Sequence, residues 1–275
     1  MEIKQIKQKS IHYRKQLLHY IKKANAGHTG GDLSCIDILN VLYNQILHVS
    51  PESFANPNRD RYIQSKGHSV EALYVVLADC GFFPEDDLDT LCQYHSPYVG
   101  HPTRKVHGIE HNTGALGHGL SVSVGLALAA KLDQRDYRVY CLLGDGELAE
   151  GSNWEAVLSA SHYQLDNLIA IVDHNQLQIT GNTRDVCNTD PLAEKFSAFG
   201  WQVRQVDGHD IAALIDCLEQ PPKLQCPHVV IAHTIKGKGI SFMENDKKWH
   251  HRVPSDAQFE RAMNELNAAA YALSK

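Results

Sequence analysis

Two short polar segments, each following an apolar run, hold the residues of this sequence best suited to chemistry. Gly144-Asp145-Gly146 follows the run VYCLL, and Asp173-His174-Asn175 follows the run LIAIV. A hard divalent cation such as Mg²⁺ takes carboxylate and amide oxygens and shares its other positions with phosphate oxygens. The two segments therefore suggest a cation site made by Asp145 and Asn175. The flanking glycines would let main-chain N–H groups approach a phosphate closely.

The spacing of the two segments supports this interpretation over a simpler one. Asp-Gly is a common turn dipeptide, so Asp145 could be a turn residue and Asn175 a strand-end cap. However, 28 residues separate Gly146 from Asn175, which is the length of one strand-to-strand crossover with its helix. In open parallel sheets, ligands bind outside the carboxyl ends of the strands. If the two strands are neighbours, their polar side chains converge, close to the positive end of a helix starting near Ser152.

The histidines form a second pattern. The chain has 17 histidines, and several stand beside glycine, as in Gly27-His28, Gly67-His68 and Gly100-His101. This pairing indicates imidazoles on tight loops, where the backbone can approach a ligand. Any one of them could still be an ordinary exposed loop histidine. That simpler interpretation is the one we favour for His107, His111 and His118. His107 and His111 stand four residues apart, but Gly108 and the loop composition argue against a helical zinc pair.

The elements that would position these residues alternate in type. Apolar periodicity predicts helices from Ile3 to near Gly27 and over 34–47, 69–79, 120–132, 152–163, 191–199, 210–219 and from about 255 onward. The helix at 120–132 is expected to be buried. Strands are predicted at 61–65, 137–145, 167–175, 201–207 and 228–235, with loop structure over 92–117. This order predicts one α/β domain over residues 1–275, with a mainly parallel sheet flanked by helices.

Composition excludes several function classes. The net charge is −6, with 43% hydrophobic and 21% charged residues and no long basic block, so neither nucleic acid nor a membrane surface is an expected partner. The N-terminal segment lacks the apolar core of a signal peptide, and the most apolar stretch, 120–132, is too short to span a bilayer. Seven cysteines without a C-x-x-C pair favour reduced thiols and a cytoplasmic location. The segment IKGKGI lacks the spacing of a nucleotide-binding phosphate loop.

The motifs resemble those of a known enzyme family. The GDG segment, with Asn175 after 28 residues in LIAIVDHNQLQITG, is similar to the thiamine diphosphate–magnesium fingerprint shared by transketolases and 2-oxo acid decarboxylases. Five stretches look like transketolase sequence, in that family's order along the chain. They are AGHTGG, DRYIQSKGH, GHPTRKVHGIEHNTGALGHG, GDGELAEGSNWEA and KGKGISFMEN.

The resemblance implies roles for particular residues. Asp145, the Asn175 side chain and the Leu177 main-chain carbonyl would bind Mg²⁺ (or Ca²⁺ or Mn²⁺). Contacts to thiamine diphosphate would come from His68, Gly114, Ala115, Leu116, Gly144 and Gly146. Glu150 and Glu155 match acidic residues of a carboxylate network that links two active sites across a dimer, although Glu155 could equally be a solvated helix residue.

Catalytic histidines are implied in the same way. His28 and His101 would line the channel to the reactive carbon of the cofactor and handle protons of the sugar hydroxyls. One further histidine corresponds to His250 or His251. The distance from Pro254 favours His251 and adjacency to Trp249 favours His250, so both stay candidates.

The resemblance covers only the first domain of a one-chain transketolase. The implied protein is therefore the N-terminal subunit of a split transketolase, whose pyrimidine-binding and C-terminal domains lie on a separate polypeptide in a heterotetramer. The implied reaction transfers a two-carbon ketol (glycolaldehyde) unit from a ketose phosphate to an aldose phosphate, as in the pentose phosphate pathway. The alternatives are a subunit of a 2-oxo acid dehydrogenase, a transketolase-like enzyme with an unusual sugar, or a non-catalytic binding protein.

Overall fold

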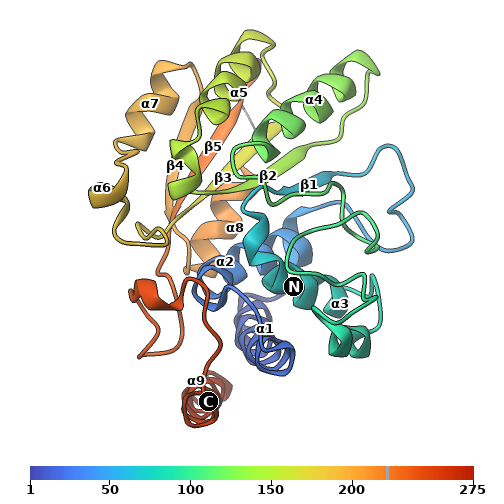
Figure 1. Cartoon of the computed structure of the whole chain (residues 1–275). Helices are drawn as coiled ribbons and strands as arrows, with labels where there is room; N and C mark the ends of the chain where they lie inside the picture. Colours follow the sequence, from blue (N-terminus) through green and yellow to red (C-terminus); the bar gives the residue numbers. More distant parts are fainter. Residues whose placement is uncertain (221–222) are drawn as a thin grey trace.

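A five-stranded, fully parallel β-sheet forms the centre of the molecule (Figure 1). The structure is a computed structural model that describes residues 1–220 and 223–275. The strands lie in the order β1-β2-β3-β5-β4. Their bounds are β1 (Arg61–Gln64), β2 (Val139–Gly144), β3 (Leu168–His174), β4 (Gln202–Asp207) and β5 (His228–His233). The α/β class and the parallel sheet expected from the sequence are thus confirmed.

Helices cover both faces of the sheet (Figure 1). On one face lie α4 (Gly119–Leu132), α5 (Gly151–His162) and α7 (Leu192–Ala198), with the short α6 (Thr183–Val186) nearby. On the other face lie α2 (Thr29–Val41), α3 (Val70–Asp79) and α8 (Ile211–Glu219), and outside them α1 (Ile3–Ala24) and α9 (Asp256–Ser274). Shorter helical turns are η1 (Leu42–Ile46, a π-helix), η2 (Gly67–Ser69), η3 (Glu85–Thr90), η4 (Gly146–Ala149) and η5 (Lys247–Trp249).

Two apolar cores hold the layers together. All seven residues of β3 are buried, and alternate side chains enter opposite cores. Ile169 and Ile171 pack with the α1, α2 and α3 side chains, whereas Ala170 and Val172 pack with those of α4, α5 and α7. A strand that is buried on both faces has a continuous run of apolar residues, which explains why the sequence LIAIV does not alternate with polar residues.

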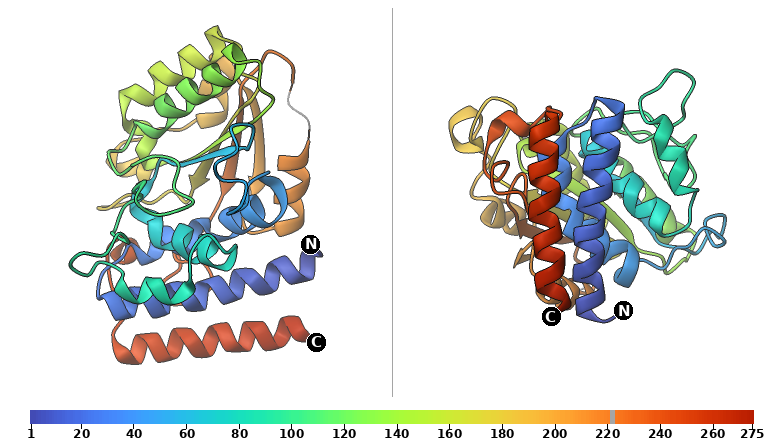
Figure 2. Two further views of the ribbon diagram at one scale, coloured as in Figure 1. Left: turned by 90° about the vertical axis from the view of Figure 1, so that its right-hand side faces the viewer. Right: turned by 90° about the horizontal axis from the view of Figure 1, so that it is seen from below.

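The first and last helices lie side by side on the outside of the molecule (Figure 2). A salt bridge from Lys22 to Asp256 and a hydrogen bond from Lys22 Nζ to the Pro254 carbonyl at 3.1 Å join the C-terminal end of α1 to the start of α9. Helix α9 begins with a capping box formed by Ser255 and Gln258. No helix in the described ranges is long and apolar enough to cross a membrane.

The structure corrects two of the predicted helices. The helix predicted over 34–47 begins five residues earlier, at Thr29, and its last turn is the π-helix η1. Glycines at 30 and 31 make a poor helix start by propensity. Gly30 is needed because a Cβ there would lie 2.9 Å from the Trp249 carbonyl oxygen.

The second correction concerns 120–132, which is only half-buried. Leu132 is 75% exposed, and nothing lies within 4 Å of a Cβ built at Gly125. Apolar composition alone predicted burial all round, but in the single chain one face of α4 is open within the described ranges.

Candidate cofactor site

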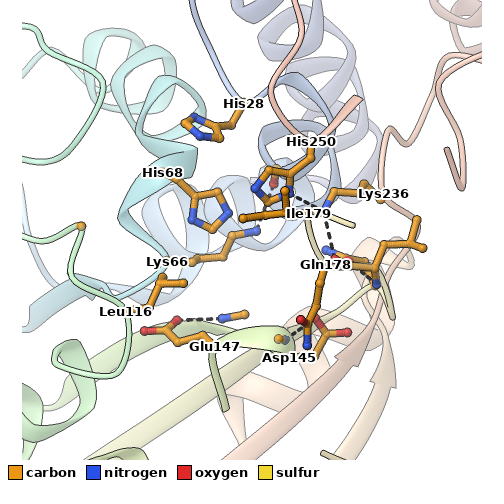
Figure 3. A pocket seen from close by; sticks show the side chains of 16 residues that line it. His28, Lys66, His68, Leu116, Asp145, Glu147, Gln178, Ile179, Lys236 and His250 are labelled. Atoms are coloured by element: carbon orange, nitrogen blue, oxygen red, sulfur yellow. Dashed lines mark hydrogen bonds between the residues drawn. The ribbon is translucent and has the colours of Figure 1, made fainter. Parts of the chain in front are cut away.

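A pocket of about 240 Å³ lies at the carboxyl ends of β2 and β3 (Figure 3). The register pairs Gly144 with Asp173, so β2 and β3 are neighbours as the spacing argument required. The residues named from the sequence that line it are His28, His68, Gly114, Leu116, Gly144, Asp145, Gly146, Asn175, Leu177 and His250.

Asp145 and Asn175 are buried and fixed by main-chain hydrogen bonds. The Gly146 N–H donates to Asp145 Oδ1 at 2.7 Å, and the Gln176 N–H donates to Oδ2 at 2.5 Å. The Leu177 N–H donates to Asn175 Oδ1 at 3.1 Å. The bond from Gln176 ties the end of β2 to that of β3, so both side chains are held before any ligand arrives.

The electrostatics of Asp145 favour a nearby cation. Burial, with Asp173 as the second cause, raises the pKa of Asp145 to about 7. A bound divalent cation would offset both effects and keep the carboxylate ionised. Asp145, Asn175 and the Leu177 carbonyl are all oxygen donors, which is the ligand chemistry that Mg²⁺ prefers. The donor set therefore fits such a cation.

The buried carboxylate of Asp173 holds the Asn175 side chain in place. This carboxylate pairs with Lys66, and it accepts hydrogen bonds from Ser34 Oγ at 2.5 Å and Asn175 Nδ2 at 3.3 Å. Burial opposes the charge on Asp173, but Lys66 lowers the pKa of Asp173 below its ordinary value. Lys66 Nζ also donates to the Gly31 carbonyl at 3.1 Å, which links the strand end to the start of α2.

Glu147 anchors the glycine-rich turn on the opposite wall. Its carboxylate accepts hydrogen bonds from the Gly117 and Gly144 N–H groups, both at 3.0 Å, and from Ser65 Oγ at 2.5 Å. These bonds hold Leu116 at the pocket edge (Figure 3).

Four histidines surround His28. Its ring centroid lies 5.2 Å from that of His68, 5.6 Å from His250, 4.6 Å from His251 and 6.3 Å from His101. The rings of His68 and His250 stack at 5.4 Å. The cluster joins loops from four distant parts of the sequence.

Burial keeps the inner imidazoles neutral. It lowers the pKa of His28 to about 4 and that of His250 to about 3, and it lowers the pKa of His68 well below its ordinary value. Neighbouring cations, Lys66 and Lys236 among them, add to the shift in each case. Neutral imidazoles near pH 7 can accept protons, as general bases do.

The two candidates for the further histidine occupy different places. His250 lines the pocket, and its Nδ1 lies 3.1 Å from Lys236 Nζ. His251 is exposed, with its ring against His28.

Other residues named from the sequence lie at the margin of the pocket or outside it. His101 and Ala115 are exposed and are not among the pocket-lining residues. His101 still approaches Gly114 closely, because a Cβ there would lie 2.7 Å from His101 Cδ2. Glu150 and Glu155 are exposed near the start of α5, and their role in a network across a dimer stays a prediction.

Sequence reasoning missed six lining residues: Gly31, Lys66, Glu147, Gln178, Ile179 and Lys236. Lys236 donates to the Leu177 carbonyl at 3.0 Å, and burial lowers the pKa of Lys236 to about 8. Gln178 Nε2 is buried, and no hydrogen-bond partner within the described ranges reaches it. Lys236 lies in the segment IKGKGI, which was set aside because it lacks the spacing of a nucleotide-binding phosphate loop.

Comparison with known proteins gives the class. The transketolase thiamine diphosphate-binding domain family matches residues 6–267. One of the subunits of apulose-4-phosphate transketolase from Phocaeicola vulgatus is 46% identical over all of this chain and 98% of its own. A 6-deoxy-6-sulfo-D-fructose transketolase subunit of a Clostridium species is 40% identical over 92% of this chain and 93% of its own.

The solved structure of transketolase from Campylobacter jejuni superposes with a TM-score of 0.90 at 32% identity. The match covers 99% of this chain and 46% of that one, so the chain spans less than half of the solved protein. The chain belongs to the transketolase family, and its residues 6–267 match that family's thiamine diphosphate-binding domain.

Proposed function

We propose that this chain is the N-terminal subunit of a two-subunit transketolase, in which Asp145, Asn175 and the Leu177 carbonyl bind Mg²⁺ and the diphosphate of the cofactor. The observation that carries the proposal is that main-chain N–H groups fix the side-chain oxygens of Asp145 and Asn175. These oxygens share the pocket with Gly146 and with the cationic Lys66 and Lys236. When bound, thiamine diphosphate supplies the carbanion that carries the two-carbon unit.

The chain's own residues would bind the cofactor and position it. The Nε2 of Gln178, which no partner within the described ranges reaches, is a donor suited to phosphate oxygens. The Gly146 N–H donates to Asp145 Oδ1 in the structure, so a phosphate oxygen would share or replace this acceptor. A Cβ at Gly146 would lie 2.7 Å from Gln178 Cγ, so glycine keeps this wall open. Leu116 and Ile179 provide apolar contacts at the pocket edge for a ring system (Figure 3).

The neutral histidines would handle protons. His28, His68 and His250 converge over the pocket, and each is unprotonated near neutral pH. His101 and His251 extend the cluster toward solvent, where a sugar would enter. Proton removal from ketose hydroxyls by positioned imidazoles contributes roughly 10²–10⁴-fold to such reactions.

A partner polypeptide is part of the proposal. The pyrimidine-binding and C-terminal domains would lie on that second polypeptide, and two copies of each would form a heterotetramer. Support comes from exposed apolar side chains on the neighbouring helices α4 and α5. Leu132 is 75% exposed, Leu158 is 59% exposed and Tyr163, directly after α5, is 50% exposed. Exposed apolar side chains that gather in one patch are typical of protein–protein contacts.

The proposal for the sugar substrate depends on the named relatives. The relatives named for apulose 4-phosphate and for 6-deoxy-6-sulfo-D-fructose favour the alternative of an unusual ketose over the common pentose phosphates. The histidine cluster, which suits polyhydroxylated substrates, argues against a 2-oxo acid decarboxylase. The cytoplasmic location and a role in the pentose phosphate pathway stay predictions.

The test is reconstitution. This chain is purified alone and together with the polypeptide encoded beside its gene, and ketol transfer is assayed with xylulose 5-phosphate and with apulose 4-phosphate as donors. We expect turnover only with both polypeptides and thiamine diphosphate present. Activity of the isolated chain would refute the division of the enzyme between two polypeptides.

A further inference from the structure

Two carboxyl groups that the cofactor site does not use lie buried side by side behind the pocket. Asp32 lies in the first turn of α2 and is 0% exposed. Glu71 lies in the first turn of α3 and is 2% exposed. Two adjacent buried carboxylates without a counter-ion would repel each other strongly.

The hydrogen bonds leave one oxygen of each group without a donor. Asp32 Oδ1 accepts from the Ala72 N–H at 3.0 Å, which ties α2 to α3. Asp32 Oδ2 and Glu71 Oε2 are buried, and no donor within the described ranges reaches either atom. The bond from Ala72 places the Asp32 carboxyl at the first turn of α3, where Glu71 immediately precedes Ala72, and a hydrogen bond between the two carboxyls would satisfy both atoms. Such a bond requires that one of them carry a proton.

The surrounding charges do not replace that proton. Lys66 is the nearest cation, and it is already paired with Asp173. The other titratable neighbours are Cys35 on α2, Tyr74 on α3 and Cys92 in the following loop, and all three are neutral near pH 7. Burial raises the pKa of both Asp32 and Glu71, so the pair retains a proton well above the ordinary carboxyl range.

The pair joins the two turns that carry pocket histidines. His28 immediately precedes α2, and His68 stands three residues before Glu71. Between them, a Cβ at Gly31 would lie 3.5 Å from His68 Nε2. Any separation of the first turns of α2 and α3 would therefore move His28 relative to His68.

We propose that Asp32 and Glu71 share one proton, and that this shared proton positions the His28 and His68 turns for cofactor binding. The carboxyl of Glu71 donates its O–H to Asp32 Oδ2, and no bond other than this O–H···O contact changes. At alkaline pH the proton leaves to solvent, the two carboxylates repel, and the two turns lose their fixed spacing. The positioning role depends on the proposed function, whereas the shared proton does not.

The proton is tested on the full chain without cofactor. The folded chain keeps a proton that the unfolded chain loses above its ordinary pKa of about 4, so stability falls as pH rises until the folded pKa is passed. Glu71→Gln keeps a donor for Asp32 but cannot titrate. Between about pH 5 and 8, the unfolding constant of the native chain should therefore rise by up to about tenfold per pH unit relative to Glu71→Gln.

Infrared spectroscopy gives a second measurement that needs no variant to be stable. The native chain at pH 8 should show the carbonyl stretch of a protonated, buried carboxylic acid, and Glu71→Gln should lack it. Glu260→Gln, on the exposed face of α9, is the matched control and should change neither the band nor the pH slope.

The outcomes separate the two parts of the proposal. No acid band in the native chain, or an unchanged pH slope in Glu71→Gln, would overturn the shared proton. If the band is present, titration of thiamine diphosphate with Mg²⁺ should show affinity that falls with pH in the native chain and less steeply in Glu71→Gln. Equal profiles would overturn the positioning role, and failure of the native chain and its complex to bind the cofactor would instead refute the proposed function.

Discussion

The Lys66 ammonium and the Asp173 carboxylate form an ion pair in which neither side chain exceeds 2% exposure. Lys66 lies between the histidine cluster and the strand ends (Figure 3). Asp173 in turn holds Asn175, and Lys66 holds Gly31, so one ion pair supports both walls of the pocket.

Removal of one partner of this pair should be severely destabilising. Lys66→Met leaves Asp173 buried without a counter-ion, which costs about 3–5 kcal/mol. Urea unfolding of the full chain measures the loss. The double variant Lys66→Met/Asp173→Asn should recover a substantial part of it, because the uncompensated charge is gone. A loss below about 1 kcal/mol for the single variant would contradict the buried pair.

Two glycines of α4 provide a matched test of packing. A Cβ at Gly119 would overlap the Ser65 side chain, whereas nothing lies within 4 Å of one at Gly125. Gly119→Ala should therefore destabilise the chain by about 1–3 kcal/mol. Gly125→Ala should stabilise it by about 0.5–1 kcal/mol through helix propensity. Thermal unfolding measures the change in stability of both variants. Equal changes would mean that α4 does not pack as described.

The adjacent residues His250 and His251 should differ in their contribution to cofactor binding. His250 lines the pocket beside Lys236, so His250→Asn should weaken thiamine diphosphate binding by about tenfold, the loss of one hydrogen bond to a charged group. His251→Asn should leave that affinity within about twofold, because His251 is exposed and its ring lies against His28 rather than in the pocket. Fluorescence titration of the cofactor compares them. The reverse order would assign the pocket role to His251.

Asp37 should make the chain acid-sensitive. It is buried, pairs with Arg14 at 2.7 Å and accepts from His209 Nδ1 at 2.8 Å. Burial opposes ionisation, but Arg14 and His209 hold the pKa of Asp37 well below its ordinary value. Its stabilisation is therefore present above the unfolded pKa of about 4 and is lost as pH falls toward the folded pKa.

The variant Asp37→Asn tests this pH dependence. It should be less stable than the native chain by about 3–5 kcal/mol at pH 7, because Arg14 is left without its partner. The difference in thermal midpoint should shrink steadily below pH 4. A difference that stays constant from pH 7 to pH 3 would contradict the depressed pKa.

Local signals allowed the fold and the centre of the site to be predicted from the sequence. The apolar runs that end at Gly144 and at Asp173 indicated both the strands and their common edge, because ligand-binding side chains follow strand ends in parallel sheets. The register of Gly144 with Asp173 confirms that arrangement. The repeated Gly–His pairing indicated histidines on ligand-binding loops, and the family resemblance indicated which of them belong to the site.

What could not be predicted depends on contacts between distant segments. Glu147, Lys66 and Lys236 each bind main-chain groups far away in the sequence. In the sequence alone, a single charged residue is most simply interpreted as an exposed side chain. The early start of α2 is a tertiary effect, since close approach of Trp249 requires Gly30. The exposed face of α4 was missed because composition does not show which apolar side chains stay exposed.

The central claim is that Asp145 and Asn175 hold a divalent cation that binds the cofactor's diphosphate. Calorimetric titration of thiamine diphosphate into the complex, with Mg²⁺ or with chelator, tests it most directly. Asp145→Asn is compared with Asp133→Asn, an exposed acid just after α4. We predict binding that requires Mg²⁺, is weakened at least tenfold in Asp145→Asn and is unchanged in Asp133→Asn. Native affinity in Asp145→Asn, or binding that is equal with and without Mg²⁺, would contradict the claim.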